Sequence, residues 1–214
     1  MSDHELKKTL SQQIYDILVT DILKGRIVPG DKLTNRELQQ RFGISSTPIR
    51  DAIRMLAADG LLENVTNAGA YVIRLDPVFT NEINTFISVI SCDALRLSAK
   101  TGRQEEIVTL LKMYQKLMAE SKDDEYFEHD FHYHKTFFDY CENRLFKDVF
   151  KQTHLIHRML FRHAIRTAKD RRITIAQHRQ ITQAFADGDY ELACRYMEEH
   201  FQTGISMFKE VHAK

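Results

Sequence analysis

Four side chains in the second half of the chain have the types and spacing of a metal site. Asp130 and His134 are four residues apart, so on a helix they point the same way, one turn apart. His178 and His200 each lie within an apolar stripe of a later predicted helix, where an imidazole must find a partner. Three imidazoles and one carboxylate suit a divalent metal such as Zn, Ni or Mn.

The histidines also permit a plainer interpretation, because the chain contains 10 of them. The competing positions are His129 and His132 beside His134, and a separate group of His154, His157 and His163. From spacing alone, ordinary core or surface histidines satisfied by hydrogen bonds remain the commoner explanation.

Six predicted helices must position these side chains. Apolar residues recur at helical spacing from Val78 onward, after a joint at Leu75-Asp76-Pro77. The predicted helices span 80–100, 104–121, 123–141, 145–168, 174–187 and 189–208. We therefore expect an all-α six-helix bundle over residues 76–214.

Composition is that of an ordinary globular protein. Of the 214 residues, 43% are hydrophobic and 28% charged, and the scarcity of glycine (8) and proline (3) favours helices over a sandwich or barrel. The zero net charge gives no sign of nucleic acid, but a small basic patch would suffice to bind it. Three cysteines without CxxC spacing suggest reduced packing thiols. No run approaches the roughly 18 apolar residues of a membrane span, so we expect a cytoplasmic protein.

A short helix in the first half is suited to reading DNA. After Gly43, the run Ser45-Ser46-Thr47 supplies a hydroxyl start signal, and Pro48 lies where the first helical turn tolerates it. Arg50 and Arg54 face away from an apolar stripe of Ile49, Ile53, Leu56 and Ala57. Such a helix, ending near Gly60, fits a DNA major groove.

The segments around this helix complete a winged helix-turn-helix over residues 1–75. Helices are predicted at 6–24 and 35–42, the second opened by Thr34 with Glu37 as a capping box. Strands at 61–63 and 70–74, joined by a turn at 67–69, form a small β-hairpin wing. The expected fold is thus mainly α, with a winged N-terminal unit and a helical C-terminal one.

Residues 14–73 resemble the GntR family of bacterial transcription regulators. The resemblance rests on GRIVPGDKLTNRELQQRFGISSTPIRDAIRMLAADGLLE and on the wing glycine. It implies DNA contacts by Arg36, Ser45, Ser46, Thr47, Arg50 and Gly69. Ser46 stands where the family commonly has an arginine that reads guanine, so the operator sequence cannot be transferred.

Residues 77–205 resemble the FCD effector domain of the FadR branch of that family. The matching segments are DFHYHKTFFDYCEN, with Asn143 nine residues after its second histidine, and HRQITQAFADGDYELACRYMEEH, with histidines 22 apart. The resemblance implies that Asp130, His134, His178 and His200 bind a divalent metal below a cavity for a small carboxylate effector.

The second half departs from that branch at its effector contacts. Ile87 and Ser91 stand near positions where the branch often carries an arginine and a glutamate. Arg158 and Arg162, on the predicted fourth helix, are the candidates to replace the arginine as effector ligands. The alternative is that Arg158 and Arg162 form part of a charged helix face exposed to solvent.

The sequence therefore predicts a metal-containing, metabolite-responsive transcriptional regulator, a repressor rather than an enzyme. We expect a homodimer that binds a near-palindromic operator and releases it when a small organic or sugar acid binds. Two alternatives are a helical metalloenzyme, a hydrolase using the Asp/His site, and an interaction module with no effector.

Overall fold

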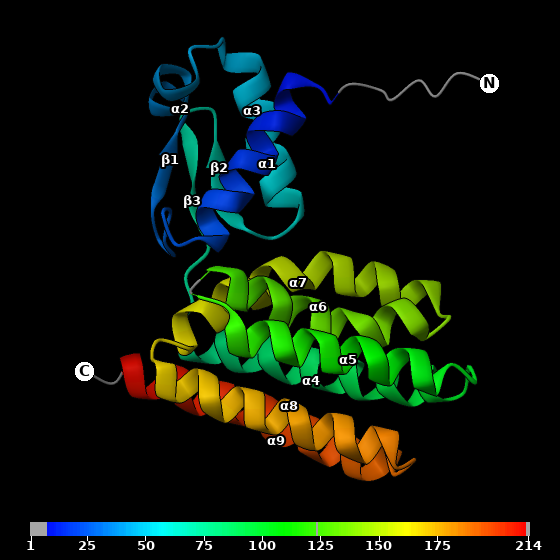
Figure 1. The fold of residues 1–214 in the computed structure, drawn as a ribbon. Coiled ribbons are helices and arrows are strands. Elements are labelled where there is room, and N and C mark those ends of the chain that lie inside the picture. The colour runs from blue at the N-terminus through cyan, green and yellow to red at the C-terminus, as the bar shows by residue number, and fades with distance from the viewer. Residues whose placement is uncertain (1–7, 123, 213–214) are drawn as a thin grey trace, which may run out of the picture. The chain divides into compact units, whose positions relative to one another are not determined.

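The computed structural model describes residues 8–122 and 124–212 (Figure 1). Two compact units divide between Leu75 and Asp76. The predicted start of the first helix, at Leu6, lies outside the described residues, as does Asp123, the predicted start of the third bundle helix. All three cysteines are buried with free thiols. Among the described residues, no helix has the length and apolar character needed to cross a membrane.

The first unit combines three helices with a small antiparallel sheet (Figure 1). Its elements are α1 Leu10–Leu23, β1 Lys32–Thr34, α2 Asn35–Phe42, α3 Ser46–Ala58, β2 Leu62–Thr66 and β3 Gly69–Val72. The strand order is β1-β3-β2, so the predicted hairpin gains a third strand. That strand pairs Leu33 with Ala70 and has only three residues, too few to reveal an alternating pattern.

Helix ends in this unit follow their residue types, with one exception. Thr34 accepts a hydrogen bond from the Glu37 amide at 3.2 Å, and Gly43 ends α2 in the left-handed conformation at φ +67°. The predicted hydroxyl cap of α3 is not made, because Ser45 occupies the N-cap position without a side-chain hydrogen bond. This exposed hydroxyl remains available for another partner.

A buried apolar core joins α1 to α3 beneath the helix-turn-helix. Its members are Ile14, Leu18 and Ile22 of α1 and Ile49, Ile53 and Leu56 of α3, each at most 2% exposed. Burial of these six side chains fixes α3 with its arginine-bearing face outward.

Gly69 fixes the wing by the absence of a side chain. Its φ is +146°, and an added Cβ would lie 2.1 Å from the Leu33 carbonyl oxygen. We expect Gly69→Ala to destabilise the first unit by roughly 2–5 kcal/mol, through backbone strain and a clash with β1. Urea denaturation followed by circular dichroism measures this loss.

The matched control is Gly43→Ala, since Gly43 also has a positive φ but meets nothing within 4 Å. Strain alone should then cost about 1–2 kcal/mol. Equal losses for the two variants would contradict a steric role for Gly69.

The second unit is the expected six-helix bundle (Figure 1). Its helices are α4 Pro77–Ala99, α5 Gln104–Glu120, α6 Asp124–Tyr140, α7 Arg144–Ala164, α8 Ala168–Ala186 and α9 Tyr190–His212. The prediction erred by extending the fourth helix to Ala168 and starting the fifth at Thr174. Thr167 and Asp170 instead form a capping box that opens α8 six residues earlier.

Packing around α6 places the predicted ligands inside the bundle. This helix contacts α4, α5 and α7, and α9 contacts α4, α7 and α8. Tyr126, Tyr133 and Phe137 on α6 are fully buried. The residues between them on the same face, Asp130 and His134, are thereby carried into the interior.

Candidate metal centre and nucleic-acid interface

The structure brings the four predicted metal ligands together. Asp130 and His134 come from α6, His178 from α8 and His200 from α9, and one ligand atom of each lies within 4.8 Å of the others. None of the four is more than 6% exposed. Side chains separated by 70 residues therefore form one buried cluster.

Two distances within this cluster match shared coordination of one ion. His178 Nε2 lies 3.2 Å from His134 Nε2 and 3.5 Å from Asp130 Oδ1. Two donors that share an ion at about 2.1 Å lie about 3.0 Å apart at a right angle and about 3.4 Å apart at the tetrahedral angle. The three-nitrogen, one-oxygen set is one that Zn, Ni and Mn accept.

Unpaired polar atoms give a second indication. Asp130 Oδ1, His134 Nδ1 and His178 Nδ1 are buried with no hydrogen-bond partner among the described residues. Burial raises the pKa of Asp130 well above its usual value, although Arg158 opposes this. Burial, reinforced by neighbouring histidines, lowers the pKa of His134 and His178 well below the usual value. A cation between Asp130 Oδ1 and the Nε2 atoms of His134 and His178 would compensate the buried carboxylate, so these residues fit a metal. The Nδ1 atoms of both imidazoles would then carry the protons.

Gln177 orients the fourth ligand. The Thr203 hydroxyl donates to the Glu199 carbonyl at 2.8 Å, and Gln177 Nε2 donates to Thr203 Oγ1 at 2.8 Å. The Gln177 Oε1 oxygen is thus left as acceptor, 3.2 Å from His200 Nδ1. His200 then carries its proton on Nδ1 and turns the Nε2 lone pair toward the cluster.

Replacing Gln177 with leucine should weaken metal binding while all four ligands remain. The expected loss is about 10- to 100-fold, because His200 would lose the acceptor that sets its tautomer and ring orientation. Competition with a chromophoric chelator measures the affinity. Gln183→Leu is the control, since Gln183 lies exposed on the same helix and bonds only to Asp187 within α8. Equal affinity in both variants would exclude this positioning role.

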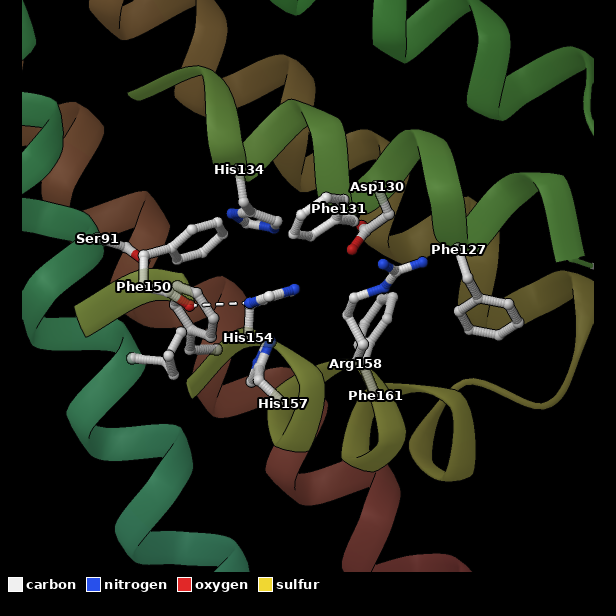
Figure 2. A pocket seen from close by; sticks show the side chains of 12 residues that line it. Ser91, Phe127, Asp130, Phe131, His134, Phe150, His154, His157, Arg158 and Phe161 are labelled. Atoms are coloured by element: carbon white, nitrogen blue, oxygen red, sulfur yellow. Dashed lines mark hydrogen bonds between the residues drawn. The ribbon is translucent and has the colours of Figure 1, made fainter. Parts of the chain in front are cut away.

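A cavity adjoins the metal cluster (Figure 2). Its apolar lining consists of Ile87, Phe127, Phe131, Phe150, Phe161 and Phe201, and its polar lining of Ser91, Asp130, His134, His154, His157 and Arg158. The cavity volume is about 20 Å³, room for little more than one water molecule. A ligand must therefore displace side chains to enter.

The two predicted effector arginines differ in position. Arg158 lines the cavity, where it pairs with Glu128 and stacks over the Phe131 ring at 4.4 Å. Arg162 is not among the lining residues and pairs with Asp124 at 2.6 Å. Arg158 thus lies at the cavity and Arg162 outside its lining, and the effector roles of both arginines stay predictions.

In the first unit, most predicted DNA contacts are on the surface. Arg36, Ser45, Thr47 and Arg50 are exposed, and Ser46 is half-buried. Gly69 is buried beside β1, where an added Cβ would meet the Leu33 carbonyl, and its contact with DNA stays a prediction. The exposed residues at the hairpin turn are Asn67 and Ala68.

A polar groove runs between α3 and the hairpin. Its lining residues are Asn35, Arg50, Ile53, Arg54, Val65, Thr66 and Asn67. Asn35 holds the hairpin turn against α2, because its side-chain amide donates to the Asn67 carbonyl and its backbone amide to the Ala68 carbonyl. Two arginines beside a fixed wing form a surface suited to a phosphate backbone.

Comparison with known proteins gives the identity of both units. Residues 10–72 match the family described as bacterial regulatory proteins, gntR family, and residues 82–203 match the FCD domain. The chain belongs to the GntR family. Its two halves are therefore a GntR DNA-binding domain and an FCD domain, as the sequence resemblance implied.

Relatives over nearly the whole length are transcriptional regulators. This GntR protein is 26% identical to the HTH-type transcriptional regulator YdhC of Bacillus subtilis, covering 99% of this chain and 97% of the relative. It is also 26% identical to the HTH-type transcriptional repressor RspR of Escherichia coli, covering 90% and 86% respectively. The fold matches E. coli McbR/YncC with a TM-score of 0.77, at 18% identity over 96% of this chain and 99% of that one.

These findings decide between the functional classes. The GntR protein is a DNA-binding transcriptional regulator, and its relatives give no support to the alternative of a helical hydrolase. The buried Asp/His cluster lies within the FCD domain.

Sequence reasoning on this GntR protein missed two histidines of the cavity. His154 Nδ1 lies 2.8 Å from the Lys151 carbonyl, which directs the other side of its ring toward the cavity (Figure 2). His157 lies between the cavity and the metal cluster, and burial lowers its pKa to about 4. His154, His157 and Arg158 lie on one face of α7. Their spacing in the sequence was the signal that could have identified the two histidines as cavity residues.

The other histidines take the ordinary roles that spacing alone favoured. His132 stacks on Tyr114 at 5.5 Å and lies 3.4 Å from Glu128, and His163 Nδ1 lies 2.8 Å from the Met159 carbonyl. His129 is exposed. None of the three belongs to the metal cluster.

Proposed function

We propose that this protein is a metal-containing repressor that binds a near-palindromic operator as a homodimer and releases it when a small carboxylate binds in the FCD cavity. The observation that carries the proposal is the continuity of the buried Asp/His cluster with that cavity: Asp130 and His134 belong to both. Because the protein acts on bacterial DNA, we place it in the cytoplasm.

In this proposal, the chain's residues orient the acid and exclude water. A divalent ion such as Zn, Ni or Mn would supply a positive anchor for a carboxylate oxygen. Arg158 supplies a second positive group at the same end of the cavity. When the ligand binds, Arg158 breaks its ion pair with Glu128 and pairs with the ligand carboxylate instead. The aromatic walls exclude water, which strengthens both interactions.

Ligand binding then controls DNA binding through the pairing of subunits. Two recognition helices must meet half-sites separated by about one turn of DNA. An acid that binds better to an arrangement with another spacing shifts the population away from the operator-bound form. The cation serves as structure and anchor, with no catalytic role.

An exposed apolar face on α4 supports the homodimer. Phe86 is 43% and Val89 57% exposed, and they lie three residues apart on one helix. We expect Phe86→Lys to weaken dimerisation at least about 10-fold, because a charge would replace an aromatic contact. Analytical ultracentrifugation measures the association.

Met113→Lys is the control, because Met113 is a similarly exposed apolar residue (42%) on α5. It should leave the dimer intact. A wild-type protein that is monomeric at micromolar concentration would contradict the proposed dimer.

The direct test combines metal analysis with a gel shift on DNA from the protein's own promoter. The protein as purified, a chelator-treated sample and a sample reloaded with Zn²⁺ are each titrated with a panel of small acids. The proposal requires bound metal, a shift, and release by an acid that depends on the metal. A shift that no acid reverses would favour a DNA-binding module without an effector. Metal without any shift would reject the regulator mechanism.

A further inference from the structure

We propose that the cavity selects a small carboxylic acid with an aromatic body and a single hydroxyl at its far end, and that Ser91 recognises that hydroxyl. This inference rests on the proposed function, because it takes the cavity beside the metal cluster as the effector site. It narrows the ligand from organic and sugar acids in general to one class.

The first observation is the separation of polar groups between two ends of the cavity. Asp130 and Arg158 lie on one side, and Ser91 lies on the opposite side beside Phe150 (Figure 2). A carboxylate held near Arg158 therefore has the rest of its ligand directed toward Ser91. The ligand must span the cavity to make both contacts.

The second observation is that Ser91 is a buried hydroxyl with unused hydrogen-bonding capacity. It is 1% exposed, and its Oγ has no hydrogen-bond partner among the described residues. Ser98, a buried serine on the same helix, donates to the Leu95 carbonyl at 2.8 Å. A buried polar atom without a partner is costly, and a ligand hydroxyl would satisfy it.

The third observation is the apolar surface between these ends. Phe131 and Phe150 stack with their planes 6° apart and their centroids 5.8 Å apart, and Ile87 and three further phenylalanines complete the lining. A sugar acid would place several hydroxyls against these hydrocarbon surfaces, where only His154 and His157 could partner them between the two polar ends. A phenyl ring would replace water with favourable aromatic contacts instead.

The restricted space favours the same class. Because the cavity volume is only about 20 Å³, any ligand must part the existing side chains. A flat ring requires less displacement between planar aromatic groups than a chain of tetrahedral, hydrated carbons does. The shape and the polarity of the cavity therefore both favour an aromatic acid.

Isothermal titration of the full-length protein loaded with Zn²⁺ tests the inference with three acids: 4-hydroxyphenylacetate, phenylacetate and gluconate. Both aromatic acids should bind, the hydroxylated one about 3- to 10-fold more tightly, which is the value of one net hydrogen bond. Gluconate should bind at least about 10-fold more weakly than phenylacetate. Gluconate binding as tightly as either aromatic acid would overturn the inference.

Ser91→Ala isolates the hydroxyl contact. The 3- to 10-fold preference for 4-hydroxyphenylacetate over phenylacetate should disappear, while phenylacetate keeps its affinity. Ser98→Ala should preserve the preference, and circular dichroism verifies that each variant is folded. If Ser91→Ala does not fold, Ser91→Cys, which is close in size but a weaker hydrogen-bonding group, should reduce the preference. A preference unchanged in the folded variant would reject the role of Ser91.

The same acids, added to the protein–operator complex, separate this inference from the proposed function. Release by gluconate but not by the aromatic acids would leave the ligand-controlled repressor intact and reject the ligand class. An operator complex that no acid binds or dissociates would reject both.

Discussion

Replacing His178 with alanine is expected to weaken metal binding at least about 100-fold, more than the loss of an orienting residue such as Gln177. His178 is fully buried, and its Nε2 faces both the His134 imidazole and the Asp130 carboxylate, at 3.2 and 3.5 Å. Its removal takes a donor from the centre of the set. Metal content after dialysis and chelator competition measure the loss.

The change should also remove the stabilisation that metal provides. A ligand at 100 times its dissociation constant stabilises the folded state by about 2.7 kcal/mol. Zn²⁺ should therefore raise the melting temperature of the wild-type protein but not that of His178→Ala. In chelator the two proteins should melt within a few degrees of each other, because the alanine variant loses packing but also loses a buried, unpaired imidazole nitrogen.

His163→Ala is the matched control for this experiment. His163 is a half-buried histidine on α7, outside the cluster, with Nδ1 near the Met159 carbonyl. It should retain the metal and the full thermal response to Zn²⁺. Retention of metal by His178→Ala at wild-type affinity would show that the four side chains do not share an ion.

Residue spacing alone predicted two members of the Asp/His cluster, Asp130 and His134. The other two, His178 and His200, were chosen from the family resemblance. The four-residue spacing of Asp130 and His134 places both on one face of α6 wherever that helix packs. His178 and His200 could not be chosen among ten histidines by spacing, because their convergence depends on how α8 and α9 pack against α6. That packing depends on residues far apart in the sequence, and the apolar pattern of either helix alone does not predict it.

The errors have local physical causes. The Thr167/Asp170 capping box starts α8 within what looked like one long helix, because an apolar pattern can continue across a change of helix. The prediction lacked β1, because a strand of three residues is too short to show an alternating pattern, and it is this strand that buries the wing glycine. Ile87 and Ser91, noted as departures from the family, both line the cavity.

Replacing Arg50 with alanine is expected to weaken operator binding about 5- to 150-fold, which corresponds to the roughly 1–3 kcal/mol of one good base contact. Arg50 is exposed on the outward face of α3, whose opposite face is fixed by the buried Ile49, Ile53 and Leu56. Arg50 lines the groove beside the hairpin, and it forms no ion pair among the residues that the structure describes. Arg54, one turn along, is paired with Asp51 at 3.3 Å and should contribute less.

Fluorescence anisotropy at several salt concentrations distinguishes how Arg50 acts. If it binds only phosphate, the slope of log affinity against log salt should fall by about 1 and all sequences should be affected alike. If it reads a base, the loss should be confined to the operator while nonspecific binding is retained. Arg195→Ala controls for net charge, because it removes one exposed arginine from α9 in the FCD domain. Equal affinities for Arg50→Ala and the wild type at moderate salt would remove Arg50 from the DNA interface.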